Sequence, residues 1–449
     1  IQHLSFDKME GKGFFTKEIE QALLGGSIDV AIHSHKDLET VSPTGLTIAA
    51  VSYRENPTDL LLVHHGAVDK RLPFGFKKEA VVGTSSARRK SQIKALRPDI
   101  TIKDIRGNVP TRINKLREGQ FDAILLASAG VLRLKLDLSD LYSEELDPRV
   151  FIPAPAQGVL AYQCRDSDQE LIAILQKLHH PNVKNAISIE RDILSGFGGG
   201  CHIPIGVYAS PGNVEFEVRA TFGKDWEKFP KRVRFYAKDT IEASKKFELL
   251  KSKEYPKTVF ISRSLSQYSM LRKGCEAHGI DLFEQTFIDV KPVSFSLPKE
   301  IDWLFFSSSN GVKHFFESVD LAEVRDKKLG VYGEATARTL YGFVEIIDFI
   351  ASLGQPEDVA RQFAQVLKNN YVLFAGARDT LGSVGEGIPT NQKHFLSVYE
   401  TQLLEPKVDV EFEAYIFTSP SNIKSFVGAG NKIPSAAKVI AIGNSTSLA

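Results

Sequence analysis

Cysteine is scarce in this sequence: its 449 residues contain only Cys164, Cys201 and Cys275. The three are far apart and form no CxxC pair, so their spacing supports neither a disulfide framework nor a zinc site. Such sparse cysteine use is typical of a reducing cytosol, and we expect a cytoplasmic protein. A start methionine and a signal-peptide pattern are also lacking, so we expect the sequence to begin inside a domain.

Long apolar runs and excess charge are lacking as well. The longest apolar stretch, residues 121–132, is too short to span a bilayer, so no membrane partner is expected. Hydrophobic residues make up 43% of the chain and charged residues 25%, a composition that excludes a disordered or fibrous protein. Because 56 basic residues face 55 acidic ones, a strongly basic nucleic-acid binder is not expected either.

What the sequence does contain is an alternation of strand and helix signals. Apolar runs predict strands at 28–32, 60–63, 80–82, 101–105 and 123–126, with helices at 17–24, 88–96 and 109–118. The alternation predicts α/β layers with mostly parallel sheet. A predicted helix at 182–194 leads into the glycine-rich loop 196–201, and the strands that follow are typical of a small α+β domain.

The second half begins after a charged stretch, 245–257, which predicts a helix end and a linker. Strand signals recur at 303–306, 329–332, 371–374, 415–417 and 438–442. Segments 304–312 and 415–423 resemble each other, as do 331–337 and 441–447, which predicts two similar α/β units.

Positive charge is concentrated in residues 84–117, where ten basic residues face two acidic ones, a net charge of +8. A solvated basic helix face would explain such a run. A multi-anion site would also explain it, because arginines follow a hydroxyl-rich turn and the next predicted strand, and such positions converge on one crevice. The residues concerned are Thr84, Ser85, Ser86, Arg88, Arg89, Arg106 and Arg112. Base-reading side chains are lacking, so duplex binding is not expected.

Asp37 follows a predicted strand in the segment His33-Ser34-His35-Lys36-Asp37. These residue types at the carboxyl end of a strand are typical of a binding cleft, although a helix N-cap or a turn without chemistry would fit equally well. The two histidines lack the further cysteine or carboxylate partners of a metal site, so no metal is expected.

Cys201 follows three glycines in a loop, whereas Cys164 lies in an apolar strand-like run. An exposed loop cysteine is more often reactive or modified than a buried one. A protease-type nucleophile is not favoured, because no Cys-His-Asn set is evident.

Taken together, these segments resemble the porphobilinogen deaminase (hydroxymethylbilane synthase) family. The matching stretches follow the family's order over residues 1 to 250: 11–18, 33–38, 83–89, 96–98, 106–112, 121–134, 153–158 and 199–207. The second half is similar to uroporphyrinogen-III synthase at 305–312, 333–337, 398–401, 417–421 and 442–443.

The resemblance implies a role for each candidate residue of the first half. Asp37 matches the catalytic aspartate, whose carboxylate would stabilise positive charge on pyrrole N–H groups. Cys201 matches the cysteine that holds the dipyrromethane cofactor, a primer made from substrate, by a thioether. The remaining residues are expected to line the carboxylate-bearing cofactor and substrate, with Gln157 in the hinge region: Ser34, Lys36, Thr84, Ser85, Ser86, Arg88, Arg89, Arg106, Arg112 and Gln157.

For the second half, the resemblance implies cyclisation of hydroxymethylbilane with inversion of the last ring and loss of water, without metal or organic cofactor. Tyr399 matches a tyrosine proposed to assist departure of the hydroxyl, although a packing role at a strand end would also fit. Ser/Thr turns at 307–310, 418–421 and 445–446, with Thr336, offer donors to carboxylates.

The sequence departs from the family pattern at Glu39, where proline is usual, and at Ala156, where glycine is usual. The deaminase's amino-terminal segment with its Thr-Arg-Gly-Ser motif and the last synthase helix do not occur in the sequence. We expect truncated chain ends rather than an inactive protein.

We therefore expect a bifunctional enzyme of tetrapyrrole (heme) biosynthesis, a transferase and a lyase in one monomeric chain. Its substrates would be porphobilinogen and hydroxymethylbilane. The alternatives are deaminase activity with a degenerate synthase half, a non-catalytic anionic-solute binding protein, and a nucleic-acid binder that uses the basic window.

The expected fold is α/β multidomain: two periplasmic-binding-protein-like α/β domains plus a small α+β domain, followed by two α/β domains of uroporphyrinogen-III synthase type. The predicted domains are 1–55 with 153–178, then 56–152 and 179–250 for the deaminase, a linker at 251–257, and 258–291 with 402–449, and 292–401, for the synthase.

Overall fold

The computed structural model describes residues 16–198, 203–298, 300–351, 355–378, 383–442 and 444–448. The chain divides into two compact units. The amino-terminal unit comprises Ile1–Asp69, Phe74–Tyr255 and Tyr268–Ala277, and the carboxyl-terminal unit comprises Lys70–Pro73, Pro256–Gln267 and His278–Ala449. Within the described ranges, none of the helices has the length and apolar character that a membrane span requires.

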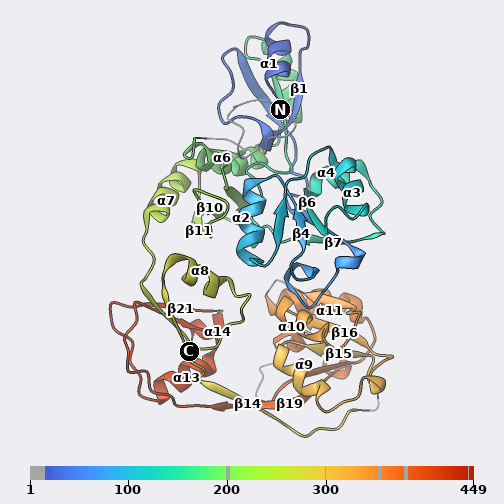
Figure 1. The fold of residues 1–449 in the computed structure, drawn as a ribbon, viewed down its shortest axis with the longest axis vertical. Helices are drawn as coiled ribbons and strands as arrows, with labels where there is room; N and C mark the ends of the chain where they lie inside the picture. The colour runs from blue at the N-terminus through green and yellow to red at the C-terminus, as the bar shows by residue number, and fades with distance from the viewer. Residues whose placement is uncertain are drawn as a thin grey trace. The chain divides into compact units, whose positions relative to one another are not determined.

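The five-stranded sheet of the amino-terminal unit has the strand order β5-β4-β6-β3-β7. Residues 60–63 are apolar throughout because both faces of the sheet are covered by helices. Ile93 of α2 packs on the face of Leu61, whereas Ile113 of α3 packs on the face of Leu62. Figure 1 shows α2 across the sheet from α3 and α4. The elements are β3 (Asp59–His64), β4 (Val81–Gly83), α2 (Ala87–Leu96), β5 (Thr101–Lys103), α3 (Val109–Arg117), β6 (Ala123–Ala127), α4 (Ser128–Leu134) and β7 (Leu141–Leu146).

Two three-stranded antiparallel sheets complete this unit. The sheet β1-β8-β2 is accompanied by α1 and α5, and the sheet β11-β10-β9 buries one face against α6 and α7. On β10 the buried Val218 and Ala220 alternate with the partly exposed Arg219, as expected for a strand with one covered face. The elements are α1 (Lys17–Leu24), β1 (Ala31–Ser34), β2 (Leu46–Val51), β8 (Leu160–Arg165), α5 (Gln169–Leu175), α6 (Pro181–Ser195), β9 (Gly206–Pro211), β10 (Phe216–Phe222), β11 (Lys231–Ala237) and α7 (Thr240–Ser252).

The prediction of mostly parallel sheet is wrong for the amino-terminal unit. All pairs of β1-β8-β2 are antiparallel, and in the five-stranded sheet β3 pairs antiparallel with both β6 and β7. Apolar runs report burial, but the direction of pairing depends on where the chain re-enters a sheet. The strand predicted at 28–32 is also displaced, because Ala31 to Ser34 are the residues that pair with β8.

Two chain segments connect the first two sheets, residues 52–58 after β2 and residues 147–159 after β7. They contact each other through the backbone, since Glu55 N donates a 2.8 Å hydrogen bond to Gly158 O. Gly158 has φ +86°, and a Cβ there would lie 2.3 Å from Glu55 O, so glycine is required. Ala156 has φ +59°, which explains why the family pattern places glycine at this position.

The carboxyl-terminal unit contains a six-stranded sheet, β14-β19-β18-β15-β16-β17, and a four-stranded sheet, β13-β12-β20-β21. All pairs are parallel except β14–β19. Every residue of β15 is buried, because Leu304 and Phe306 face the core beneath α9 and α10, while Trp303 and Phe305 face the core beneath α11. These helices surround β15 and β16 in Figure 1.

The elements beyond α7 are β12 (Thr258–Ile261), α8 (Met270–His278), β13 (Asp281–Glu284), β14 (Ile288–Pro292), β15 (Trp303–Phe306), α9 (Ser309–Phe316), β16 (Lys328–Tyr332), α10 (Glu334–Leu340), β17 (Phe349–Ala351), α11 (Pro356–Leu367), β18 (Val372–Ala377), α12 (Ser383–Glu386), β19 (Lys393–Leu403), β20 (Ala414–Phe417), α13 (Pro420–Gly428), β21 (Lys438–Ala441) and α14 (Asn444–Ser447). The strands predicted in this half coincide with β15, β16, β18, β20 and β21 to within three residues.

Candidate active sites

Asp37 lies in a short 3₁₀ helix, η2 (His35–Asp37), that follows β1 directly. Its side chain is exposed and makes no hydrogen bond to the residues that the structure describes, and Ser34 is exposed as well. Arg191 of α6 fixes the loop by donating hydrogen bonds to His35 O at 3.1 Å and Leu38 O at 3.2 Å. The predicted catalytic carboxylate of Asp37 therefore lies exposed on a loop whose backbone is held by hydrogen bonds from α6.

The adjacent histidines are structural in this arrangement. His33 shares a 3.0 Å hydrogen bond between its Nε2 and Gln163 Oε1. His35 is completely buried. Burial, followed by the charges of Arg191, Lys184 and His33, lowers the pKa of His35 to about 3.

Arg88 and Arg89 are both buried and share one carboxylate partner, Asp59 at the start of β3. Arg88 Nη1 lies 2.6 Å from Asp59 Oδ2, and Arg89 Nη2 lies 2.7 Å from Asp59 Oδ1. The two guanidinium groups also donate to backbone oxygens, Arg88 to Ile152 O at 2.9 Å and Arg89 to Leu125 O at 3.0 Å. Burial alone would raise the pKa of Asp59, but the charges and hydrogen bonds of the two arginines outweigh it and hold that pKa well below its usual range.

The turn before α2 uses its hydroxyl groups locally. Ser86 is the N-cap residue, and its Oγ accepts from Arg89 N at 3.5 Å. Ser85 Oγ donates to Ile105 O at 2.9 Å and accepts from Ile105 N at 3.0 Å, which ties this turn to the loop before α3. Thr84 is buried, and its Oγ1 accepts from Ser86 N at 3.3 Å.

Gln157 joins the arginine pair to the loop of Asp37. It is fully buried, and its Nε2 donates to Asp59 Oδ1 at 3.2 Å and to Pro57 O at 2.8 Å. Its Oε1 accepts from Lys36 Nζ at 3.3 Å. Burial lowers the pKa of Lys36, Asp37 raises it, and Arg89 lowers it, so Lys36 lies within the field of both groups.

Arg106 and Arg112 are half-buried on the loop before α3 and on α3 itself. Arg112 Nε donates to Gly107 O at 2.7 Å. Burial lowers the pKa of Arg112, and the charge of Arg89 lowers it further. The structure therefore places Arg112 near the buried arginine pair, where positive charge exceeds negative charge.

Cys201, the predicted attachment residue, lies outside the described residues. The described range resumes at residue 203, and Ile205 and Val207 are buried in the core beneath α6 and α7.

Three charged residues that the sequence did not point to hold this site together: Asp59, Glu190 and Arg191. Glu190 of α6 is fully buried, pairs with Arg54 at 2.7 Å and accepts from Ala156 N at 2.7 Å and Ala209 N at 2.9 Å. A single acid at the edge of an apolar run, as in Asp59-Leu60-Leu61-Leu62, is the signal that could have indicated a buried partner for the arginines.

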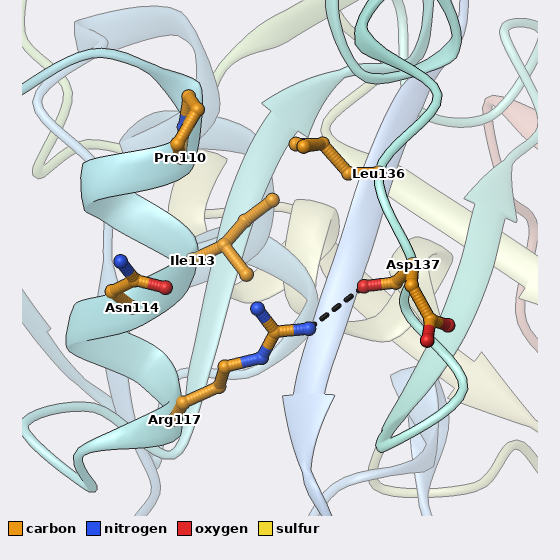
Figure 2. A pocket seen from close by; sticks show the side chains of 6 residues that line it. All are labelled: Pro110, Ile113, Asn114, Arg117, Leu136 and Asp137. Carbon is orange, nitrogen blue, oxygen red and sulfur yellow. Dashed lines mark hydrogen bonds between the residues drawn. The ribbon is translucent and has the colours of Figure 1, made fainter.

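The described residues also form a cavity of about 390 Å³ that does not coincide with these groups. It lies between α3 and the chain before β7, and Arg117 donates across it to Asp137 O at 2.7 Å (Figure 2). Its lining comprises Pro110, Ile113, Asn114, Arg117, Leu136 and Asp137. Because none of the predicted site residues lines it, the cavity is not part of the candidate site.

In the carboxyl-terminal unit, Tyr399 lies on β19 with its ring in the hydrophobic core. Its hydroxyl is 3.2 Å from Ser308 Oγ, which caps α9 by accepting from Gly311 N at 3.0 Å. The His314 ring lies 5.7 Å from the Tyr399 ring, centroid to centroid, and its Nδ1 is 2.8 Å from Glu317 Oε2. The ring of Tyr399 thus packs in the core, while its hydroxyl lies next to the N-cap residue of α9.

The other hydroxyl-rich turns of this unit begin helices. Ser419 caps α13, and Asn422 donates to Thr418 Oγ1 at 3.1 Å and Ser419 Oγ at 2.9 Å. Thr336 is buried on α10 and Thr446 on α14.

Comparison with known proteins identifies both halves. A family model described as "Porphobilinogen deaminase, dipyromethane cofactor binding domain" matches residues 1–173. The porphobilinogen deaminase of Roseiflexus sp. (strain RS-1) is 46% identical over 212 residues, which cover 47% of this chain and 68% of that protein. The chain belongs to the porphobilinogen deaminase family. The Fusobacterium nucleatum deaminase is 41% identical over 243 residues, covering 54% of this chain and 78% of the relative.

The carboxyl-terminal half of the chain matches a second family. A family model described as "Uroporphyrinogen-III synthase HemD" matches residues 269–449. A solved uroporphyrinogen-III synthetase from Helicobacter pylori aligns with 43% of this chain and 87% of its own, at 19% identity and a TM-score of 0.31. The fusion of a deaminase to a synthase, predicted from the sequence motifs, is confirmed by the two family models.

Proposed function

We propose that the chain is a bifunctional enzyme that joins four porphobilinogen molecules into hydroxymethylbilane, with release of ammonia, and then cyclises this product to uroporphyrinogen III. The observation that carries the proposal is the array around Asp59, in which two buried arginines share one carboxylate. Lys36 and Arg112 add positive charge near it. A ligand with several carboxylates fits this excess.

The residues present fit the dipyrromethane cofactor, which the matched deaminase domain binds. Arg88 Nε is a buried donor without a partner among the described residues, as expected where a ligand carboxylate is to be held. Arg88, Arg89, Arg106 and Arg112 would hold the carboxylates of the cofactor and of the growing chain, and Cys201 would attach the cofactor. When bound, the cofactor supplies the primer to which pyrrole units are added.

Asp37 would act at the reacting pyrroles. Its carboxylate is exposed on η2, close enough to Lys36 to raise the pKa of that lysine. Positive charge develops on pyrrole N–H groups when ammonia leaves and when the new carbon–carbon bond forms. A fixed carboxylate stabilises this charge more in the transition state than in the ground state.

In the synthase half, Tyr399 would donate a proton to the departing hydroxyl of hydroxymethylbilane, with Ser308 holding its oxygen at 3.2 Å. The amino-terminal ends of α9 and α13 carry the positive end of the helix dipole, which favours a carboxylate. The predicted domain boundaries and the fold type of each domain stay predictions. Two synthase domains are supported by the division of the strands between two sheets, with β12, β13, β20 and β21 in one and β14 to β19 in the other. The monomeric state and the cytoplasmic location also stay predictions.

A product-isomer experiment tests the function. Purified protein incubated with porphobilinogen should give uroporphyrinogen III as the main product. Asp37→Asn should lose most turnover of porphobilinogen, at least 100-fold, because a catalytic charge is removed. Tyr399→Phe should consume porphobilinogen normally but shift the product toward the type I isomer.

Two of the alternatives give a different result in this experiment. Type I isomer from the wild type would indicate a degenerate synthase half. A wild type that binds porphobilinogen without consuming it would indicate a non-catalytic anionic-solute binding protein.

A further inference from the structure

Asp59 is the most extensively bonded side chain of the deaminase site. Its carboxylate is fully buried and accepts five hydrogen bonds from three side chains, Arg88, Arg89 and Gln157. Oδ1 accepts four of these, at 2.7 to 3.2 Å, and Oδ2 accepts the fifth at 2.6 Å. The two guanidinium groups are therefore oriented around a single oxygen atom.

The charges of this group do not balance. One carboxylate opposes two guanidinium groups, each of which has five N–H donors. Each arginine uses three side-chain hydrogen bonds among the described residues. The pair thus retains positive charge and donors whose directions are set by Asp59.

The same carboxylate is connected to the catalytic loop. Gln157 Nε2 donates to Asp59 Oδ1 at 3.2 Å, and Gln157 Oε1 accepts from Lys36 Nζ at 3.3 Å. Lys36 precedes Asp37 in η2. A displacement of Asp59 would therefore reach both the arginine pair and the loop that carries Asp37.

We propose that Asp59 is a positioning residue of the deaminase reaction, whose buried carboxylate orients Arg88, Arg89 and Gln157 and thereby sets which anions the arginine pair accepts. The proposal rests on the deaminase function proposed above. A ligand carboxylate does not displace Asp59, because that exchange would leave a buried carboxylate unpaired. The oriented pair instead favours the fixed carboxylates of a pyrrole over a small symmetric anion, since bidentate pairing depends on direction.

The test compares a pyrrole substrate with inorganic sulfate in the full-length holoenzyme, after intact-mass analysis has confirmed cofactor loading. Asp59→Asn removes one negative charge and replaces one acceptor oxygen by an NH2 group, which cannot accept from the guanidinium groups and so disturbs their orientation. Sulfate should inhibit more strongly because the net positive charge of the arginine pair rises. The affinity for porphobilinogen should increase less, because the two guanidinium groups lose their orientation. The ratio of the porphobilinogen KM to the sulfate inhibition constant should rise about tenfold, a change that loss of stability alone does not produce.

Asp99→Asn is the matched control. Asp99 pairs at 2.7 Å with the buried Arg97 at the other end of α2 and has no contact with Gln157. Its ratio should equal that of the wild type. A folded Asp59→Asn enzyme with an unchanged ratio would overturn the proposal.

Asp59→Glu decides the question if the asparagine variant does not fold. It keeps the charge but moves the carboxylate by one methylene group. The porphobilinogen KM should rise about tenfold with an unchanged sulfate constant, and an unchanged KM would contradict the positioning role. A wild type that does not turn over porphobilinogen would instead overturn the proposed function itself.

Discussion

At the scale of single residues, buried titratable groups give the amino-terminal unit a pH dependence. His35 is completely buried, and neither ring nitrogen has a hydrogen-bond partner among the described residues. Its pKa of about 3 means that the folded protein holds this ring neutral at every physiological pH. An unfolded chain, with an ordinary histidine pKa near 6.5, binds a proton that the folded protein excludes.

We predict that His35 weakens folding as the pH falls below about 6.5. The unfolded state binds more protons between pH 3 and pH 6.5, so stability decreases through this window as acid is added. At pH 5 the loss is about 2 kcal/mol relative to pH 7. His35→Leu should remove this difference in urea unfolding at the two pH values, whereas substitution of the exposed His65 should preserve it. An unchanged pH dependence in His35→Leu would refute this account of His35.

The candidate residues could be predicted better than their partners. Arg88, Arg89, Lys36 and Gln157 gather in one place, as the resemblance implied. The charge pattern does not indicate Asp59, because this acid lies outside residues 84–117, the window that contains both arginines. Sequence neighbours do not reveal which charge will be buried next to which.

At the scale of elements, the two segments that connect the sheets β1-β8-β2 and β5-β4-β6-β3-β7, residues 52–58 and 147–159, show what the sequence could and could not predict. Apolar runs predict the strands, because a strand that is buried on both faces is apolar at every position. The antiparallel pairing of β3 with β6 and β7, and of β8 with β1 and β2, gives no such signal, because it depends on a chain that leaves one sheet and returns to it. The positive φ of Ala156 was equally hidden, since alanine gives no signal of a left-handed backbone.

Gly158 provides a test of the contact between these two connecting segments. Gly158→Ala should cost about 3 kcal/mol, because a Cβ would lie 2.3 Å from Glu55 O and the backbone has φ +86°. Gly119 has φ +73° with open space around it, so Gly119→Ala should cost only about 1 kcal/mol. Denaturant unfolding of both variants measures the difference, and equal costs would show that the segments do not pack as described.

At the scale of the whole molecule, the near-neutral charge of the chain conceals a local excess that the structure reduces but does not cancel. Lys90 pairs with Asp104 and Arg97 with Asp99, two acids that the net charge of +8 already includes, whereas Arg117 pairs with Asp140 outside residues 84–117. The solvated-face interpretation holds for Arg117, while the arginines next to Asp59 remain in excess. Asp59 and Asp140, which lie outside residues 84–117, therefore make the local positive excess smaller than the charge of that window alone indicates.

The central claim is that this chain assembles a linear tetrapyrrole on a primer attached covalently to Cys201 and then cyclises the tetrapyrrole. Intact-mass analysis of the purified full-length protein tests it most directly. The wild type should carry a mass increment equal to two linked pyrrole units, and Cys201→Ala should carry none and should not consume porphobilinogen. An unmodified wild type that still produces uroporphyrinogen, or an adduct that persists in Cys201→Ala, would contradict the account.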